Sequence, residues 1–399
     1  MKLALRRLPP KHKIKGAPIL VRVDWNIPDA AVHGLEGSLK LERSIPYIKE
    51  LSKRGAIVIL LTHLGRPKKK DKVHSTRSLA KRMKRFGLNI AFHPESVSKP
   101  EERKRLSDRL AKAEPGSLHL LENVRFEKGE ESNSITLAKA WASLGYFFVN
   151  DAFASSHRAH ASVVGIAKQL PSYAGPSLVA EVEQLGRLIE KPASPFVAVI
   201  GGKKLSTKIP VLKSLLTKCD YVLVGGAMAT PFLAAKKLQI GKSYLESGSI
   251  AQAQKLLKSK KLILPVDVML AEKLVAQPAL KRVTVDAIGK KEIIVDIGPA
   301  TLAAWSKIIA SAKTILWNGP VGWTECKSCG SGSRFIARVI ATRSKGRAFG
   351  VAGGGDTLPV LAESKSVQWF DFVSTGGGAM LEFIVMNGKL PGITALLRR

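Results

Sequence analysis

Long hydrophobic runs are missing from this sequence. None of its apolar stretches approaches the roughly 18 uninterrupted residues that a membrane-spanning helix needs. The first residues, MKLALRRLPPKHK, are basic and contain no apolar core of the kind found in a secretion signal. The sequence therefore predicts a cytoplasmic protein without a membrane span.

Cysteine is scarce as well. The chain has three cysteines, Cys219, Cys326 and Cys329, and the last two form a single CxxC pair. A structural zinc site uses four ligands, usually from two such pairs, and the sequence has no second pair. We interpret Cys326 and Cys329 as a surface thiol pair, open to redox chemistry and without a catalytic role.

Acidic residues are too few to balance the basic ones. The chain has 31 Asp and Glu against 64 Lys and Arg, which gives a formal net charge of +33. The basic residues are densest between Arg66 and Arg85, where Asp71 is the only acidic residue. Such a charge attracts polyanions, either nucleic acids or phosphorylated metabolites. The sequence has no helix-turn-helix, zinc-finger or RNP-like aromatic motif, so we interpret most of the charge as a solvated, lysine-rich surface.

The motifs of the two commonest phosphoryl-transfer architectures are also absent. The tripeptide Gly241-Lys242-Ser243 resembles the end of a Walker A motif, but Lys236 occupies the position of the earlier glycine that the motif requires. The signature set of protein kinases is missing too. These absences exclude a P-loop enzyme and a protein kinase.

The residues that are present have the pattern of an α/β protein. Hydrophobic residues make up 45% and charged residues 24% of the chain, as in globular proteins, and 399 residues suit two domains. Short apolar runs rich in β-branched residues alternate with longer amphipathic stretches, which is typical of parallel sheets with crossover helices. We expect strands at residues 19–23, 56–61, 89–92, 117–121, 146–149, 196–200, 221–224, 262–265, 293–295, 314–317 and 348–351, with early helices at 43–54 and 77–86.

A helix expected at residues 176–191 separates the two halves and is followed by Pro192 and Pro195. The pattern predicts two Rossmann-like α/β domains with mainly parallel sheets in three-layer αβα architecture. The N-terminal domain covers residues 1–175, a hinge helix 176–192, and the C-terminal domain 193–379. Sheets of this kind bind ligands beyond the carboxyl ends of their strands.

Charged and amide side chains follow the expected strands of the first half. Four loops bring basic side chains to one edge of one sheet, and two polar residues lie beside them: His63, Arg66, Arg125 and Arg158, with Asp24 and Asn26. A guanidinium group binds phosphate or carboxylate through two parallel hydrogen bonds. Several converging arginines therefore predict a ligand with more than one anionic group.

Glycine-rich loops follow the strands of the second half. These are Gly201-Gly202, Gly225-Gly226, Asn318-Gly319-Pro320, Gly353-Gly354-Gly355-Asp356-Thr357 and Thr375-Gly376-Gly377-Gly378. Glycine lets backbone N–H groups approach a phosphate closely, and a helix N-terminus behind the loop adds a favourable dipole. Lys204 and Lys208 are four residues apart and share one face of a helix start, beside this phosphate path.

With these residues in view, the chain is similar to the phosphoglycerate kinase family over nearly its whole length. The order and spacing of the matching stretches agree with the family: VRVDWNIP (21–28), THLGRP (62–67), LLENVRFEKGEESN (120–133), VNDAFASSHRAHAS (149–162), GGKKLSTKI (201–209), GGAMATPFL (225–233), LPVD (264–267), DIGP (296–299), WNGPVG (317–322), GGGDT (353–357) and STGGGAMLE (374–382).

The resemblance implies reversible phosphoryl transfer from 1,3-bisphosphoglycerate to ADP, giving 3-phosphoglycerate and ATP in glycolysis and gluconeogenesis. It implies magnesium as the ion that accompanies ADP or ATP, and closure of the two domains about a hinge. It also implies that the last segment, 380–399, packs back on the N-terminal domain. We expect a monomer with small-molecule substrates and without a membrane or nucleic-acid partner.

The resemblance also implies roles for individual residues. Those implied in catalysis are Lys204, Lys40 and Gly377. Those implied in binding the phosphoglycerate are Asp24, Trp25, Asn26, Lys40, His63, Leu64, Gly65, Arg66, Arg125 and Arg158. Those implied in binding the nucleotide are Lys204, Lys208, Gly225, Asn318, Glu325, Gly353, Gly354, Gly355, Asp356 and Thr357. Lys204 would accompany the moving phosphoryl group, Glu325 would accept hydrogen bonds from the ribose, and Asp356 would interact with the nucleotide-bound magnesium.

The sequence departs from the family where the family has an arginine that stabilises the transition state. That arginine stands six residues before the proline matched by Pro46, and the chain has Lys40 there. Lysine keeps the charge but loses the two-pronged geometry of arginine. Either Lys40 takes the role or Arg43 reaches in from the next helical turn, and we favour Lys40.

Two further departures lie near the expected nucleotide site. Thr324 stands where an aromatic residue usually precedes the ribose-binding glutamate, with Trp323 before it. Lys203 replaces a usually small residue and adds charge. Two other hypotheses remain open: a different small-molecule kinase on a similar scaffold, and a basic nucleic-acid-binding protein with a kinase-like fold.

Overall fold

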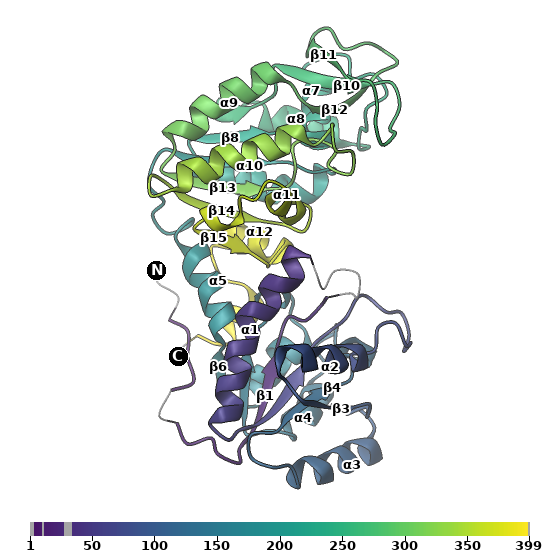
Figure 1. The fold of residues 1–399 in the computed structure, drawn as a ribbon, viewed down its shortest axis with the longest axis vertical. Helices are drawn as coiled ribbons and strands as arrows, with labels where there is room; N and C mark the ends of the chain where they lie inside the picture. Colours follow the sequence, from purple (N-terminus) through teal and green to yellow (C-terminus); the bar gives the residue numbers. More distant parts are fainter. Residues whose placement is uncertain (1–3, 10–11, 28–33, 398–399) are drawn as a thin grey trace. The chain divides into compact units, whose positions relative to one another are not determined.

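The computed structural model describes residues 4–9, 12–27 and 34–397 (Figure 1). Pro28, in the stretch VRVDWNIP, lies outside the described residues, as do the first and last few residues of the chain. Internal contacts divide the chain into two units. The first unit comprises Met1–Gly186 and Met386–Arg399, and the second comprises Arg187–Val385.

The first unit is built on a six-stranded sheet in the order β3-β4-β2-β1-β5-β6. All neighbouring strands in it are parallel. The strands are β1 (Pro18–Arg22), β2 (Ile57–Leu61), β3 (Ile90–His93), β4 (Leu118–Leu121), β5 (Phe147–Asn150) and β6 (Ser172–Ala174). The strand order reverses at β1, which pairs with β2 on one side and with β5 on the other. Loops after β1, β2, β4 and β5 therefore meet at the carboxyl edge of the sheet.

Alternating residues of each strand in this sheet pack into two separate cores. Ile19 and Val21 contribute to one core, which α1 and α2 cover, and Leu20 contributes to the other, which α3 and α4 cover. Because successive side chains of a strand point to opposite faces, a strand apolar on both faces must be buried between helices. The helices of this unit are α1 (Leu35–Lys53), α2 (Arg77–Met83), α3 (Pro100–Ala111), α4 (Ile135–Ala142), α5 (Pro176–Gly186) and α13 (Pro391–Thr394).

The second unit has a six-stranded parallel sheet in the order β15-β14-β13-β7-β8-β9. Its strands are β7 (Phe196–Ile200), β8 (Tyr221–Val224), β9 (Leu262–Ile263), β13 (Thr314–Asn318), β14 (Phe349–Gly353) and β15 (Phe372–Ser374). A smaller antiparallel sheet has the order β11-β10-β12, from β10 (Asp267–Ala271), β11 (Lys281–Thr284) and β12 (Ile293–Ile297). The helices are α6 (Ile209–Lys218), α7 (Thr230–Ala235), α8 (Ser249–Leu256), α9 (Pro299–Ser311), α10 (Ser331–Ser344), α11 (Thr357–Glu363) and α12 (Gly378–Val385).

The predicted fold class is confirmed, and the expected strands form within one or two residues of their predicted ends. The strand expected at residues 293–295 forms as β12 and belongs to the small antiparallel sheet. The helix expected at 176–191 ends at Gly186, and α12 keeps residues up to Val385 in the second unit. Among the described residues, no helix is both long and apolar enough to cross a membrane.

Candidate active site

An ion pair between Asp24 and Lys40 lies at the carboxyl end of β1. Lys40, on α1, is 8% exposed, and its Nζ lies 3.3 Å from Asp24 Oδ2 and 2.7 Å from Glu36 Oε1. Burial lowers the pKa of Lys40, but the two carboxylates outweigh it and leave the pKa above its ordinary value. Lys40 is therefore a charged ammonium group held next to Asp24.

Arg43 lies one helical turn further along α1 and faces a different element. Its Nη1 lies 3.2 Å from Glu181 Oε1, and Glu181 belongs to α5. The Glu181 side chain is only 2% exposed. Of the two candidates for the missing family arginine, the structure thus brings Lys40 to Asp24 and pairs Arg43 with α5.

His63 follows β2 and contacts an arginine that the motif analysis did not single out. His63 Nδ1 lies 3.0 Å from Nη2 of Arg22, which is the last residue of β1. Burial lowers the pKa of His63 well below its ordinary value, and the charges of Arg22, Arg125, Lys40 and Arg158 lower it further. His63 is therefore a neutral ring surrounded by cations.

The loop after β2 is tied to the loops after β1 and β4. Gly65 N–H donates to Asn26 Oδ1 over 2.8 Å, and Gly65 O accepts from Arg125 Nη1 over 2.9 Å. Gly65 has φ 63°, and a Cβ atom there would lie 2.3 Å from His74 Cδ2, so only glycine fits. Burial lowers the pKa of Arg125, and the nearby charges of Arg158 and Arg66 add to the effect. Arg158 and Arg66 are therefore each close enough to repel the guanidinium group of Arg125.

The remaining predicted residues of the first unit differ in exposure. Arg66 is exposed, and Arg158 is half-buried with its Nε 3.0 Å from His157 Nε2. Trp25 is wholly buried, and its indole N–H donates to Ser44 Oγ over 2.9 Å. Leu64 is also in the core. The side chains of Trp25 and Leu64 therefore belong to the core and are not exposed to a ligand.

In the second unit, Lys208 ties together the loops that follow β7 and β13. Its Nζ donates to Gly201 O over 2.9 Å and also to Asn318 Oδ1. Asn318 Nδ2 in turn donates to Gly353 O over 2.7 Å, at the end of β14. Burial lowers the pKa of Lys208 to about 8, against the opposing charge of Asp356. A single half-buried lysine thus holds glycine loops from neighbouring strands of the sheet.

The loop Gly353–Thr357 is fixed by the side chain of its last residue. Thr357 Oγ1 accepts from Gly319 N over 2.8 Å and donates to Gly353 O over 3.0 Å. Gly354 has φ 109°, a conformation that favours glycine. The exposed Gly355 and Asp356 stand at the start of α11. Their backbone N–H groups and the helix dipole favour an anion there.

A pocket of about 770 Å³ adjoins this loop within the second unit. Its lining includes Lys203, Glu325 and Asp356, together with backbone of Gly202 and Gly226. Glu325 and Asp356 are both exposed carboxylates. The Nζ of Lys203 lies 5.2 Å from the centre of the Tyr244 ring, which also lines the pocket. The pocket therefore combines apolar walls with charges of both signs at its rim.

The other three predicted residues of this unit are placed outside the lining of the pocket. Lys204 is exposed, next to Lys203. Gly225 is packed so closely that an added Cβ would lie 2.8 Å from Val321 Cβ. Gly377 has φ 52° and directly precedes α12.

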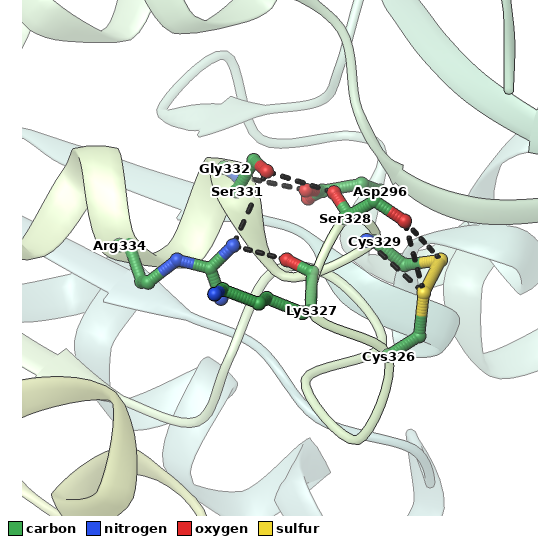
Figure 2. Close-up of a disulfide and its surroundings, with 8 residues drawn as sticks. All are labelled: Asp296, Cys326, Lys327, Ser328, Cys329, Ser331, Gly332 and Arg334. Atoms are coloured by element: carbon green, nitrogen blue, oxygen red, sulfur yellow. Dashed lines mark hydrogen bonds between the residues drawn. A yellow bond between two sulfur atoms is a disulfide. The ribbon is translucent and has the colours of Figure 1, made fainter. Parts of the chain in front are cut away.

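The interpretation of Cys326 and Cys329 as a surface thiol pair was wrong. Both residues are 0% exposed and are joined in a disulfide within a small apolar cluster. Figure 2 shows the bond with Ser328 beside it and Arg334 reaching back to Lys327 O. Cysteine spacing in a sequence says nothing about burial, which here comes from Ala271 and Val295 of the small sheet.

Sequence reasoning missed the residues beneath His63. Arg22, Ser155, Ser162 and Glu130 are all buried and form one hydrogen-bonded group. The sequence did carry a signal for the first of them, because Arg22 is a charged residue within an apolar strand. Its partners come from segments far away in the chain and could not be identified from spacing.

The chain was compared with known proteins. A family model described as phosphoglycerate kinase matches residues 10–389. The phosphoglycerate kinase of Xanthobacter flavus is 38% identical over 404 residues, covering 99% of this chain and all of that protein. The phosphoglycerate kinase of Deinococcus radiodurans is 41% identical over 391 residues, covering 96% of this chain and 92% of that protein.

Solved structures give the same result. The structure of phosphoglycerate kinase from Coxiella burnetii matches with a TM-score of 0.82 at 37% identity, covering 97% of both chains. The structure of phosphoglycerate kinase from Pyrococcus horikoshii OT3 matches with a TM-score of 0.84 at 26% identity, covering 98% of both chains.

Proposed function

Since the chain belongs to the phosphoglycerate kinase family, we propose that its two units divide the ligands of the family reaction between them. The protein is an enzyme, a phosphotransferase that moves a phosphoryl group between 1,3-bisphosphoglycerate and ADP, giving 3-phosphoglycerate and ATP in glycolysis. In our proposal the first unit binds the phosphoglycerate and the second unit binds the nucleotide.

The observation that carries the first assignment is the cluster of cations at the carboxyl edge of the first sheet. Arg66, Arg125 and Arg158 come from three loops, and the charges of Arg158 and Arg66 lower the pKa of Arg125, so binding of an anion would relieve this repulsion. Both carboxylate oxygens of Asp24 are buried, and apart from the ion pair with Lys40 no described residue donates a hydrogen bond to them. Such oxygens suit a hydroxyl donor, and a three-carbon phospho-acid carries one beside its anionic groups.

The second assignment is supported by the glycine loops and the pocket beside them. The exposed backbone at Gly354–Asp356 suits the phosphates of a nucleotide, and the apolar pocket walls suit its base. Glu325, at the pocket rim, suits the ribose hydroxyls.

Magnesium is the ion that we expect with the nucleotide. It prefers carboxylate and phosphate oxygens and usually takes only one or two protein ligands. Asp356 fits this requirement, because its exposed carboxylate lies at the pocket and at the start of α11. When bound, the ion would neutralise charge on the phosphates. Lys208 is half-buried and already bonded to Asn318, so we assign it to holding the loops together.

Phosphoryl transfer of this kind needs positioning and charge neutralisation more than a covalent intermediate. The acceptor oxygen belongs to one of the substrates, so the protein need not supply a nucleophile. We propose that Lys40 and Lys204 supply positive charge to the moving group, and that Gly377 adds a backbone N–H at the start of α12. Transfer requires the two ligands to meet away from water, so we also propose that the units close on each other during turnover.

The test is a coupled assay of ATP formation from ADP and 1,3-bisphosphoglycerate. Calorimetry with 3-phosphoglycerate and with Mg-ADP, each alone, then tests the division of ligands. The matched control is a double variant, Lys40→Ala with Lys204→Ala, which lacks both proposed neutralising charges. If the wild-type enzyme formed ATP no faster than this double variant, the catalytic roles of Lys40 and Lys204 would be refuted. We further propose a monomer that works in the cytoplasm, where these substrates are found.

A further inference from the structure

We propose that Arg22 is a positioning residue that holds His63 in one tautomer, with the ring proton on Nε2. In this form His63 offers a neutral N–H donor to an anionic oxygen of the phosphoglycerate. The inference rests on the proposed role of the first unit as the phosphoglycerate site, and it adds a residue that does not itself contact the ligand.

The contact between the two side chains decides the tautomer. Arg22 Nη2 lies 3.0 Å from His63 Nδ1. A guanidinium group has five N–H donors and no acceptor, and it stays protonated in proteins. Nδ1 must therefore accept, so in a neutral ring the proton is on Nε2. A doubly protonated ring would place an N–H at Nδ1 against an N–H of Arg22, which the geometry excludes.

Arg22 can impose this choice because other residues fix its own position. It is 1% exposed, and its Nη1 donates to Val23 O over 2.6 Å. Its Nε donates to Ser162 Oγ over 3.2 Å, and its Nη2 also reaches Ser155 Oγ at 3.3 Å. A guanidinium held at three other points cannot turn away from His63 at low cost, because its N–H groups would then be buried without partners.

The positive charge of Arg22 is balanced by the buried carboxylate of Glu130, to which it is linked through Ser162. Ser162 Oγ, which accepts from Arg22, donates to Glu130 Oε1 over 2.5 Å, and Ser162 N donates to Glu130 Oε2 over 2.8 Å. Glu130 is 1% exposed. The chain Glu130, Ser162, Arg22 and His63 thus leads from a buried carboxylate to the ring. Second-layer groups of this kind are known to orient histidine rings and to select their tautomers.

The tautomer matters because the two forms of the ring present opposite chemistry to a ligand. With the proton on Nε2, the ring donates a hydrogen bond to an anionic oxygen. With the proton on Nδ1, the Nε2 lone pair would face that oxygen and repel it. A neutral donor also adds no further charge to a site that already holds Arg66, Arg125 and Arg158.

The experiment uses the full-length enzyme labelled with ¹⁵N-histidine. Two-bond ¹H–¹⁵N correlation spectra at neutral pH report which ring nitrogen carries the proton, and His63→Gln assigns the signal of His63. We expect an Nε2–H ring in the wild-type protein. An Nδ1–H ring or a doubly protonated ring would overturn the proposal without any further variant being needed.

Variants then test whether Arg22 is the cause. In Arg22→Met we expect a mixture of tautomers and a loss of 3-phosphoglycerate affinity of about tenfold or more, with Mg-ADP affinity within about twofold of wild type. Arg22→Lys keeps a cationic donor and should retain the Nε2–H form. It is the variant that tests the proposal if Met is not tolerated in the core. The matched control is Ser155→Ala, which removes one support of Arg22 and should leave the tautomer unchanged.

The outcomes separate this proposal from the site assignment. If Arg22→Met showed an altered tautomer with unchanged 3-phosphoglycerate affinity, His63 would not face the ligand and its place in the site assignment would fail. Loss of the Nε2–H form in Arg22→Lys would refute the positioning role, because lysine keeps a cationic donor. If Arg22→Met kept a pure Nε2–H ring, the positioning role would be refuted even with the site assignment intact.

Discussion

Replacing Lys40 by Ala should nearly abolish turnover, and it should also destabilise the first unit. Lys40 is buried between Asp24 and Glu36, and it is the cation that the structure holds closest to Asp24 on α1. Losing one preorganised group that stabilises a transition state typically lowers the rate by about 10²–10³-fold. We therefore expect kcat to fall by about that factor, with a smaller change in KM for 3-phosphoglycerate.

The same substitution leaves Asp24 with a buried, uncompensated carboxylate. Removing one partner of a buried ion pair costs about 3–5 kcal/mol. Urea denaturation should show this loss, and kcat must be normalised to the folded fraction measured under assay conditions. Lys40→Met, which keeps most of the volume, should show the same loss of rate and separates the effect of charge from that of packing.

Arg43→Ala is the matched control on the same helix. Its ion pair with the buried Glu181 faces α5, so we expect a loss of stability of up to about 3–5 kcal/mol, as for Lys40→Ala, but a kcat of the folded enzyme within about threefold of wild type. Lys40→Arg should hold or raise the rate, because a guanidinium restores two-pronged contact with the moving group. A folded Lys40→Ala enzyme with near-normal turnover, or a larger loss in Arg43→Ala, would refute the assignment of Lys40.

Three further results are expected. Arg158→Ala should weaken 3-phosphoglycerate binding by about 2–4 kcal/mol in calorimetry and leave Mg-ADP binding unchanged, since a charge-assisted contact is lost from one unit only; equal losses for both ligands would contradict the division of ligands. Lys204→Ala should lower kcat more than it raises either KM, and steady-state kinetics with unchanged kcat would remove its catalytic role. Asp151→Asn should flatten the pH dependence of stability. Burial raises the pKa of Asp151 to about 7, so the native state holds a proton that the unfolded state releases above about pH 4. The wild type should therefore lose up to about 4 kcal/mol of stability relative to the variant as the pH rises from 4 to 7. Urea denaturation of both proteins at pH 4 and pH 7 measures this difference. An equal change in the free energy of unfolding for wild type and variant would contradict the prediction.

The sequence predicted the parallel sheets because their strands are short runs that are apolar on both faces. Strands such as IVILL at Ile57–Leu61 and FVAVI at Phe196–Ile200 have no other stable place than between two layers of helices. Four of the described strands were missed, and three of them lack this signal. β6 (SYA) and β15 (FVS) are three residues long, and β11 (KRVT) is largely exposed. Their positions depend on tertiary contacts, which a local pattern does not contain. The fourth, β10 (DVMLA), is mostly buried, but it begins two residues after the run assigned to 262–265 and was not separated from it.

The candidate site residues could likewise be identified where a local pattern marks them. The set was incomplete where a residue depends on tertiary contacts. Strand ends are visible in the sequence, so His63 and Arg125 could be identified from their positions after apolar runs. The support of His63 could not, because Arg22 bonds to Ser155 and Ser162, more than 130 residues further along the chain. The sequence favoured Lys40 over Arg43 but could not settle the choice, since residues three positions apart on a helix lie close to the same face.

The return of the last residues to the first unit also bears on the order in which the protein folds during synthesis. The second unit is one uninterrupted stretch and can fold once Val385 has left the ribosome. The first unit cannot be completed then, because Gly392 N donates to Ser156 O over 2.8 Å, in the loop that carries Arg158. Leu397 likewise pairs with Leu5 near the start of the chain. A growing chain can therefore complete its second unit before its first, and the loop of Arg158 gains its contact with Gly392 only after the second unit has been made.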